Sequence, residues 1–201
     1  GKLGHGDKQH QLLPKTIEAL SGRRVIAVSA GGGHSLAITA NGAVWSWGEG
    51  GSGKLGHGDE QNQLLPKKIK AFAGQRVVTV TAGKYHNLAL TADGALWSWG
   101  AGYLGKLGHG DKQHQLLPKT IEALSGRRVI AVSAGGGHSL AITANGAVWS
   151  WGEGGSGKLG HGDEQNQLLP KKIKAFAGQR VVTVTAGKYH NLALTADGAL
   201  W

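Results

Sequence analysis

The residues of this chain best suited to chemistry are His5 and Asp7, two positions apart in the opening segment GKLGHGD. Histidine and aspartate can transfer protons, but a general base needs a hydrogen-bonded partner and a substrate within about 3 Å. The glycines around Lys2 suggest a phosphate loop, yet both glycine-rich phosphate motifs run into a helix. The residues after Asp7 do not read as helical. We therefore interpret the segment as a turn in which Asp7 accepts bonds from nearby backbone N–H groups.

Histidine and tryptophan also recur at fixed places. Histidines such as His34 begin segments in which apolar and polar residues alternate. One histidine from each segment could lie near a common axis, where several imidazoles could bind a metal ion. We expect instead that they bond backbone at a turn. Trp45 and Trp47 lie on one strand face and are expected to fill space between repeats. No catalytic, cofactor-binding or metal-binding residue is predicted. The predicted structural residues are Asp7, Asp59, His34, His86, Trp45, Trp47, Trp97 and Trp99.

The whole chain repeats, and these residues recur with it. GKLGHGD returns at Gly53, Gly105 and Gly157, a spacing of 52 residues. The repeat units are 1–52, 53–104, 105–156 and a shorter 157–201. Residues 105–201 reproduce residues 1–97 letter for letter, so two related units form one module. Identity of this extent indicates recent amplification or deliberate construction.

The two unit types differ mainly in two loops. Where the first type has two glycines before its histidine, the second has Lys84 and Tyr85, and Tyr103 marks the other loop. Lysine and tyrosine on rim loops suit contact with a partner. The candidate interaction residues are Lys84, Tyr85, Tyr103, Lys188 and Tyr189.

Within a unit the pattern is that of short β-strands. Residues 23–31 are a β-branched run, and residues 34–40 and 43–48 flank Asn41-Gly42, a signal for a two-residue hairpin turn. Residues 12–20 read either as a short helix or as an outer edge strand, and Pro14 favours the strand. Four antiparallel strands in every unit predict an all-β fold, a β-propeller of four-stranded blades. The hairpins argue against a parallel β-helix.

The series L-P-x-x-I-x-A-[LF]-x-G, A-G-x-x-H-x-L-A-[IL]-T, [ND]-G-A-[VL]-W-S-W-G and G-K-L-G-H-G-D resembles the regulator of chromosome condensation repeat. The resemblance covers the whole chain and implies a β-propeller, usually of seven blades. It points to proteins such as an exchange factor for the GTPase Ran, plant UV-B photoreceptors and large ubiquitin ligases. The photoreceptor tryptophans lie in G-W-R-H, whereas this chain has GGGH at 31–34 and GKYH at 83–86. Photoreception is therefore not expected.

The resemblance also implies which residues form each blade. The strand around Val28 lies nearest the axis and residues 12–20 lie outermost. The predicted blades are 23–74, 75–126, 127–178 and 179–201, the last completed by an outer strand from 12–20 of the same or a neighbouring chain. An unpaired edge recruits a strand. Closure within one chain gives four blades, and head-to-tail exchange between two chains gives an eight-bladed homodimer. We favour the homodimer or a fragment of a longer chain.

Composition limits the partners. The chain of 201 residues has no Cys, which excludes disulfides and thiolate nucleophiles, and no Met, so it is expected to be a processed or shortened product. Its net charge of +10 favours acidic partners or nucleic acid, but the lysines and arginines are spread by repetition rather than clustered. No apolar run of about 18 residues or signal-peptide pattern occurs, so no membrane is expected and an intracellular location is slightly favoured.

These observations predict a non-enzymatic β-propeller scaffold or protein-interaction module. The family resemblance allows an alternative, an exchange-factor-like regulator of a small GTPase, and the charge allows chromatin or nucleic-acid binding. Nucleotide exchange needs a unique, asymmetric face, whereas every residue of 1–97 occurs twice in this chain. The repetition therefore favours the interaction module.

Overall fold

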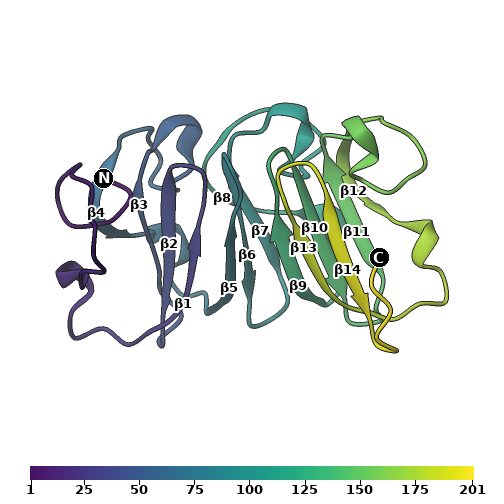
Figure 1. Cartoon of the computed structure of the whole chain (residues 1–201), viewed down its shortest axis with the longest axis horizontal. Coiled ribbons are helices and arrows are strands. Elements are labelled where there is room, and N and C mark those ends of the chain that lie inside the picture. The colour runs from purple at the N-terminus through teal and green to yellow at the C-terminus, as the bar shows by residue number, and fades with distance from the viewer.

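The computed structural model describes residues 1–201 as a series of short antiparallel strands that follow one another across the molecule (Figure 1). Three sheets have four strands each and a last sheet has two. The strands of the first two sheets are β1 (Val25–Ala30), β2 (His34–Thr39), β3 (Val44–Gly48), β4 (Gln63–Lys68), β5 (Val77–Ala82), β6 (His86–Thr91), β7 (Leu96–Gly100) and β8 (Gln115–Thr120). Those of the last two are β9 (Val129–Ala134), β10 (His138–Thr143), β11 (Val148–Gly152), β12 (Gln167–Lys172), β13 (Val181–Ala186) and β14 (Asn191–Thr195). The predicted all-β fold with repeated four-stranded antiparallel sheets is confirmed.

The sheets share one inner side. The first strand of each sheet lies next to the first strand of its neighbour, in the order β1, β5, β9 and β13. Each of the three four-stranded sheets then continues through its second and third strands to the outer strand, β4, β8 or β12. No α-helix is present. Short 3-10 helices occur at Glu18–Leu20, Gly51–Gly53, Lys70–Phe72, Tyr103–Gly105, Glu122–Leu124, Gly155–Gly157 and Lys174–Phe176. None of these helices has the length and apolar character needed to cross a bilayer.

The hairpin between the second and third strands differs from its prediction. Gly42 has φ of 80° and donates to the carbonyl of Thr39 at 2.8 Å, while Thr39 donates to Ala43 at 3.0 Å. Asn41 keeps a negative φ and accepts the N–H of Ala43 through its side chain, so the loop has three residues. A type I turn followed by a left-handed glycine fits the strand twist as well as a two-residue turn does.

The outer strand is shorter than predicted and is missing from the first unit. In the second unit it ends at Lys68, and Lys70–Phe72 form a 3-10 turn where the prediction continued the strand. Residues 12–20 contain no strand, and Leu12 is 96% exposed. An outer strand forms by pairing with a third strand, as Gly48 pairs with Gln63. Residues 12–20 have no third strand beside them in this chain.

Apolar layers between neighbouring sheets hold the molecule together. Between the first two sheets, Trp99 from β7 lies edge-on to Phe72 with ring centroids 5.6 Å apart. The layer consists of Leu36, Ile38, Val44, Ile69, Phe72, Val77, Val80, Ala89 and Trp99. Each such side chain contributes about 1.5–3 kcal/mol when fully buried. Stacking of sheet on sheet therefore fixes the loops at the sheet edges.

Candidate functional site

Two kinds of loop meet at one edge of each sheet. Because the strands are antiparallel, the end of the first strand, the start of the second, the end of the third and the start of the fourth lie at the same edge. This edge carries the short loop before each histidine and the long loop that contains GKLGHGD. The short loops are bonded from sheet to sheet, with Gly32 N–H to Gly83 O at 3.3 Å and Lys84 N–H to Gly135 O at 3.2 Å. Lys84 and Tyr85 thus stand on a fixed backbone.

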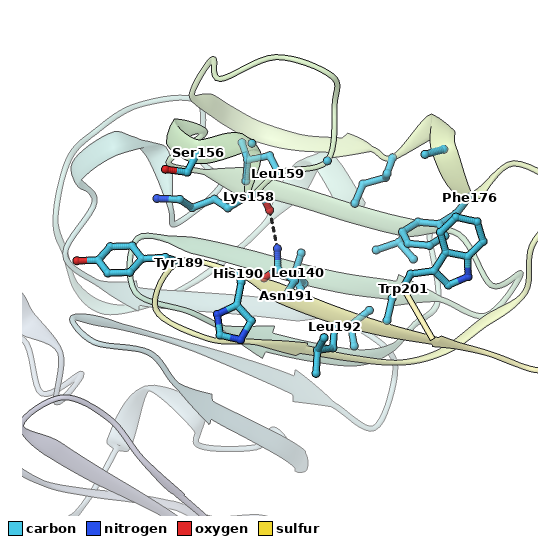
Figure 2. Close-up of a pocket in the computed structure, with 17 residues that line it drawn as sticks. Leu140, Ser156, Lys158, Leu159, Phe176, Tyr189, His190, Asn191, Leu192 and Trp201 are labelled. Atoms are coloured by element: carbon cyan, nitrogen blue, oxygen red, sulfur yellow. Dashed lines mark hydrogen bonds between the residues drawn. The ribbon is translucent and has the colours of Figure 1, made fainter. Parts of the chain in front are cut away.

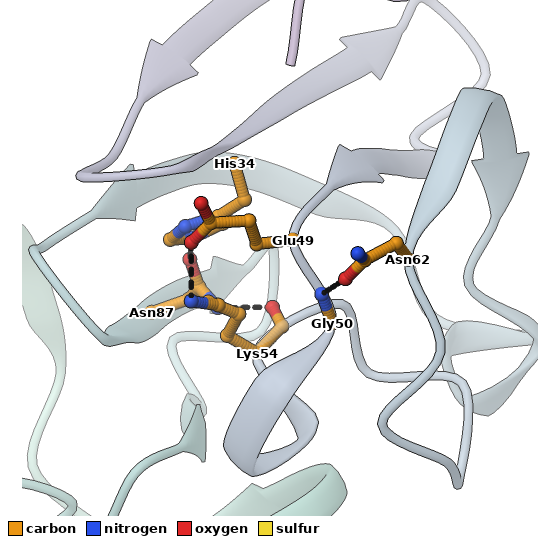
Figure 3. Close-up of polar contacts among 6 residues, drawn as sticks. All are labelled: His34, Glu49, Gly50, Lys54, Asn62 and Asn87. Atoms are coloured by element: carbon orange, nitrogen blue, oxygen red, sulfur yellow. Dashed lines mark hydrogen bonds and ion pairs between the residues drawn. The ribbon is translucent and has the colours of Figure 1, made fainter. Parts of the chain in front are cut away.

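The repeated histidines connect neighbouring sheets through side chains, where a backbone bond was expected. His34 Nε2 lies 2.6 Å from Asn87 Oδ1, and Asn87 donates its amide to the Lys54 carbonyl at 2.7 Å (Figure 3). The Asn87 oxygen is therefore the acceptor, and His34 carries its proton on Nε2. Burial lowers the pKa of His34 to about 4, so the ring is neutral. No group of three or more His, Cys, Asp or Glu side chains in the chain is arranged to hold a metal ion.

A serine lies beside the histidine of GKLGHGD, but its hydrogen bonds do not suit a nucleophile. His57 Nε2 is 3.0 Å from Ser46 Oγ, and the fully buried Ser46 donates to the Leu55 carbonyl at 2.6 Å. A nucleophilic serine needs a base that accepts its proton, whereas here the histidine must donate. Burial, followed by the charge of Lys67, lowers the pKa of His57 to about 4. This Ser–His pair holds the loop in place.

The aspartates of the motif lie in turns. Asp7 Oδ1 accepts the backbone N–H of Gln9 at 2.9 Å, and Asp59 accepts that of Gln61 at 3.0 Å. The motif also reaches the next sheet, because Gly58 donates to the carbonyl of Leu116 in β8 at 3.0 Å. GKLGHGD therefore joins neighbouring blades, a role that its position between two strands of one unit did not indicate.

The tryptophans lie in the layers between sheets. Trp47 and Trp99 are almost fully buried, and Trp99 Nε1 donates to the Lys54 carbonyl at 3.0 Å. Trp45 is partly buried under the guanidinium of Arg23, 4.4 Å from its ring centroid. Trp97 contacts Phe72 edge-on, with ring centroids 5.5 Å apart. None of these four rings stands free at the surface as a stacking platform.

Lysines and tyrosines gather around the two loops, and we call this surface the lysine–tyrosine face. The Tyr85 ring is 42% exposed and has three ammonium groups near its centroid, those of Lys84 at 4.7 Å, Lys106 at 5.6 Å and Lys54 at 5.7 Å. Tyr189 repeats the arrangement with Lys188 at 4.7 Å and Lys158 at 5.4 Å. The face consists of Lys54, Lys84, Tyr85, Tyr103, Lys106, Lys158, Lys188 and Tyr189.

Sequence reasoning found the exposed members of this face but missed the buried ones. Lys54, Lys106 and Lys158 are each the lysine of GKLGHGD and are 3–6% exposed. The lysine of GKLGHGD could have indicated these buried residues, but the sequence analysis interpreted the whole motif as a turn. Lys54 pairs with Glu49 at 3.2 Å (Figure 3), and Lys158 pairs with Glu153 at 2.9 Å.

A cavity of about 340 Å³ opens between the last two sheets (Figure 2). Its lining is largely apolar and includes Leu140, Phe176 and Trp201, and Lys158 accepts a bond from the Asn191 amide at its floor. In the two preceding pairs of sheets, the corresponding space between the apolar residues holds Trp99 or Trp151. The cavity thus belongs to the stacking of the sheets, and Lys158 and Tyr189 of the lysine–tyrosine face are among the residues that line it.

Comparison with known proteins places the chain among repeat propellers. The family model described as RCC1-like domain matches residues 1–201. The E3 ubiquitin-protein ligase HERC2 of Homo sapiens is 40% identical over 203 residues, and the ultraviolet-B receptor UVR8 of Arabidopsis thaliana is 39% identical over 201 residues. Both comparisons cover 100% of this chain but 4% of the ligase and 46% of the receptor. The chain therefore spans less than half the length of these relatives.

Solved structures show the same architecture. Human WBSCR16 superposes with a TM-score of 0.80 at 29% identity, covering 89% of this chain and 47% of that one. Yeast RCC1 (Prp20), solved with Kap60 bound to it, has a TM-score of 0.74 at 28% identity, covering 88% of this chain and 42% of that one. Together with the family match, these likenesses confirm the predicted repeat family and propeller fold.

Proposed function

We propose, because this chain belongs to the RCC1-like domain family, that it is a non-enzymatic interaction module whose binding surface is the lysine–tyrosine face. The observation that carries the proposal is the Tyr85 ring, partly exposed and surrounded by the ammonium groups of Lys54, Lys84 and Lys106. Tyrosine offers a large contact area at a low entropic cost, and the lysines favour a negatively charged partner. The partner class that fits is an acidic protein segment.

Three further facts support a protein partner. The relative yeast RCC1 (Prp20) has been solved with a protein, Kap60, bound to it. Within this chain, the serine–histidine pair is committed to loop structure, so the site offers binding without a nucleophile. The charge is also arranged in discrete clusters at Tyr85 and Tyr189 rather than along a continuous groove. A discrete cluster suits an acidic peptide better than a nucleic-acid backbone.

The test uses a fluorescein-labelled peptide of alternating Glu and Gly and measures its dissociation constant by anisotropy. The variant K84A/K188A removes two ammonium groups from the face, and K70A/K174A removes the same charge from exposed positions outside the face. We expect at least a fivefold weaker affinity for the first variant and a change below twofold for the second. Equal effects of the two variants would reduce the binding to net charge and overturn the proposed face.

The two alternatives have their own assays. An exchange-factor activity would accelerate nucleotide release from a small GTPase, and we expect no acceleration across a panel of GTPases. Nucleic-acid binding through phosphates would weaken steeply as salt rises. A dissociation constant for duplex DNA tighter than that for the acidic peptide at 150 mM salt would favour the nucleic-acid alternative.

A second proposal concerns assembly, and it is favoured by two exposed apolar faces. On the first sheet Val28 is 73% exposed, whereas its counterpart Val80 is 8% exposed under the neighbouring sheet. On the last sheet Leu192 is 43% exposed, whereas its counterpart Leu88 is fully buried. Faces of this kind are normally covered.

The two exposed faces correspond to the two sides of the contact that neighbouring sheets make within this chain. Leu88 and Leu90 of the second sheet pack with Val129, Ala141 and Trp151 of the third. Because residues 105–201 repeat residues 1–97, the last sheet of one copy would meet the same residue types on the first sheet of another copy. We therefore propose a head-to-tail homodimer of eight sheets. In it, residues 12–20 of each copy add an outer strand to the last sheet of the other, beside residues 199–201, which bond to β14.

A further inference from the structure

One buried lysine of the lysine–tyrosine face has no anionic partner, although its two counterparts have one. Lys54 is bonded to Glu49 and Lys158 to Glu153. Lys106 occupies the same place in the motif and is 3% exposed, yet its ammonium group forms no ion pair. Burial of a lysine removes part of the hydration of its ammonium group, and Lys106 is the buried motif lysine that gains no carboxylate in return.

The difference follows from two correlated changes in the loops. Ala101 stands where the other unit type has Glu49, and Tyr85 stands where it has Gly33. A β-carbon on Gly33 would collide with the carboxylate of Glu49. A side chain at the first position would therefore require the Glu49 carboxylate to move from its place beside Lys54. The second unit type has the side chain, and its lysine lacks the carboxylate.

The neighbours of the Lys106 ammonium group include two aromatic rings but no carboxylate that is free to pair with it. Its ammonium lies 5.6 Å from the Tyr85 ring centroid and 5.8 Å from that of Tyr103, so two partly exposed aromatic rings flank it. Burial lowers the pKa of Lys106, Glu153 acts in the opposite direction, and Lys84 lowers it further. The Glu153 carboxylate is already bonded to Lys158.

We propose that Lys106, with Tyr85 and Tyr103 beside it, is a subsite for a carboxylate of an aspartate or glutamate side chain from a binding partner. The carboxylate would take the role at Lys106 that Glu49 takes at Lys54. Tyr85 and Tyr103 give the stem of the acidic side chain an apolar contact, and the exposed Lys84 adds attraction at longer range. The subsite rests on the proposed function, because it names the group by which an acidic partner is held.

The first experiment follows the lysine Hε–Cε signals by NMR during titration with sodium acetate, with sodium chloride at equal ionic strength as the control. We expect the Lys106 signal to shift and saturate with acetate only, while the Lys54 and Lys158 signals move less because Glu49 and Glu153 occupy their ammonium groups. Equal shifts of all three lysines, or equal shifts in acetate and chloride, would overturn the subsite.

The second experiment gives the site its own internal carboxylate. The variant Y85G/A101E copies the Gly33–Glu49 arrangement and keeps Lys106, so it should fold and lose the acetate response. We expect it to bind the labelled Glu-Gly peptide about tenfold more weakly than the unchanged chain, and K106Q to do the same. The control K70Q removes an exposed lysine that lies outside the face and should change the affinity less than twofold.

The two readouts separate the two proposals. Acetate binding at Lys106 without peptide binding would retain the subsite and contradict the proposed function. Peptide binding that is sensitive to K84A/K188A but not to K106Q or Y85G/A101E would retain the function and overturn the subsite. A chain that responds to neither probe would overturn both.

Discussion

His86 of β6 and Ser139 of β10 lie on neighbouring sheets, and His86 Nε2 is 2.8 Å from Ser139 Oγ. Ser139 donates its own proton to the Lys106 carbonyl at 2.9 Å, so the histidine is the donor to the serine. Both side chains are fully buried. His86 follows the short loop of the blade β5–β8, and Lys106 lies in the long loop of the same blade. Ser139, from the next blade, therefore connects these two loops through its two hydrogen bonds.

The first prediction tests this connection by substitution. H86A leaves a cavity and an unpaired serine oxygen, so we expect the free energy of unfolding to fall by about 2–4 kcal/mol. The control H10A changes an exposed histidine and should alter stability by less than about 0.5 kcal/mol. Urea unfolding followed by tryptophan fluorescence measures both. Similar unfolding midpoints for the two variants would contradict the assigned role of His86.

The second prediction concerns pH. Burial lowers the pKa of His34 from its usual 6.5 to about 4, against the opposing effects of Asn87 and Glu49. The unfolded chain then binds a proton at a pH at which the folded chain does not, so stability is full above pH 6.5 and falls as the pH drops toward 4. A shift of this size corresponds to roughly 3 kcal/mol.

Urea midpoints at pH 7.0, 5.5 and 4.5 measure this dependence. Burial also lowers the pKa of His86 and His138, so they act in the same direction. In H34Q the dependence should become shallower, because one of these groups no longer titrates. A midpoint that stays constant between pH 7.0 and 4.5 would show that the histidines do not remain neutral in the folded chain.

The sequence was sufficient for the inner strands of the blades but not for the outer strand or for the contacts between blades. Period-2 alternation around His34 and the glycine after Asn41 predict a hairpin, because both signals act within a few residues. The bond from His34 to Asn87 joins residues 53 positions apart, and no local pattern indicates it. The extent of the outer strand was also misjudged, since it depends on a third strand being available for pairing.

Only the exposed residues of the candidate site were predicted from the sequence. Lys84 and Tyr85 were found because they differ between the unit types, and such differences mark loops. Lys106 is identical in every unit and was read as part of a turn. Its distinctive property, the missing carboxylate, comes from Ala101, and only the structure shows that the glutamate at this position in the other unit type pairs with the motif lysine.

The third prediction transfers the subsite to another blade. G33Y/E49A gives the first unit the tyrosine and alanine that the second type has at Tyr85 and Ala101, and removes the carboxylate from Lys54. We expect the Lys54 signal to gain an acetate response like that of Lys106. The loss in stability should stay near 1 kcal/mol, because Glu49 is largely exposed and such ion pairs contribute little. The single variant E49A is the control and should give a weaker response without the tyrosine ring.

The fourth prediction concerns assembly. If two copies join head to tail, the mass in solution should be about twice 20.8 kDa, and V28E should reduce it to that of one chain. Val28 lies on the exposed face of the first sheet, and a carboxylate there would be buried at the junction without a partner. Sedimentation equilibrium over a range of concentrations measures the mass directly.

The matched control for V28E comes from the same strand. I26E adds the same charge, but the counterparts Val78 and Ile130 stay 41% and 46% exposed even where their sheets are covered on both sides. Residue 26 therefore lies outside the junction, and I26E should leave the dimer intact. A single-chain mass for the unchanged protein at every concentration would contradict the exchange of outer strands. A dimer insensitive to V28E would place the contact elsewhere, because a buried carboxylate at residue 28 and two closely packed sheets are incompatible.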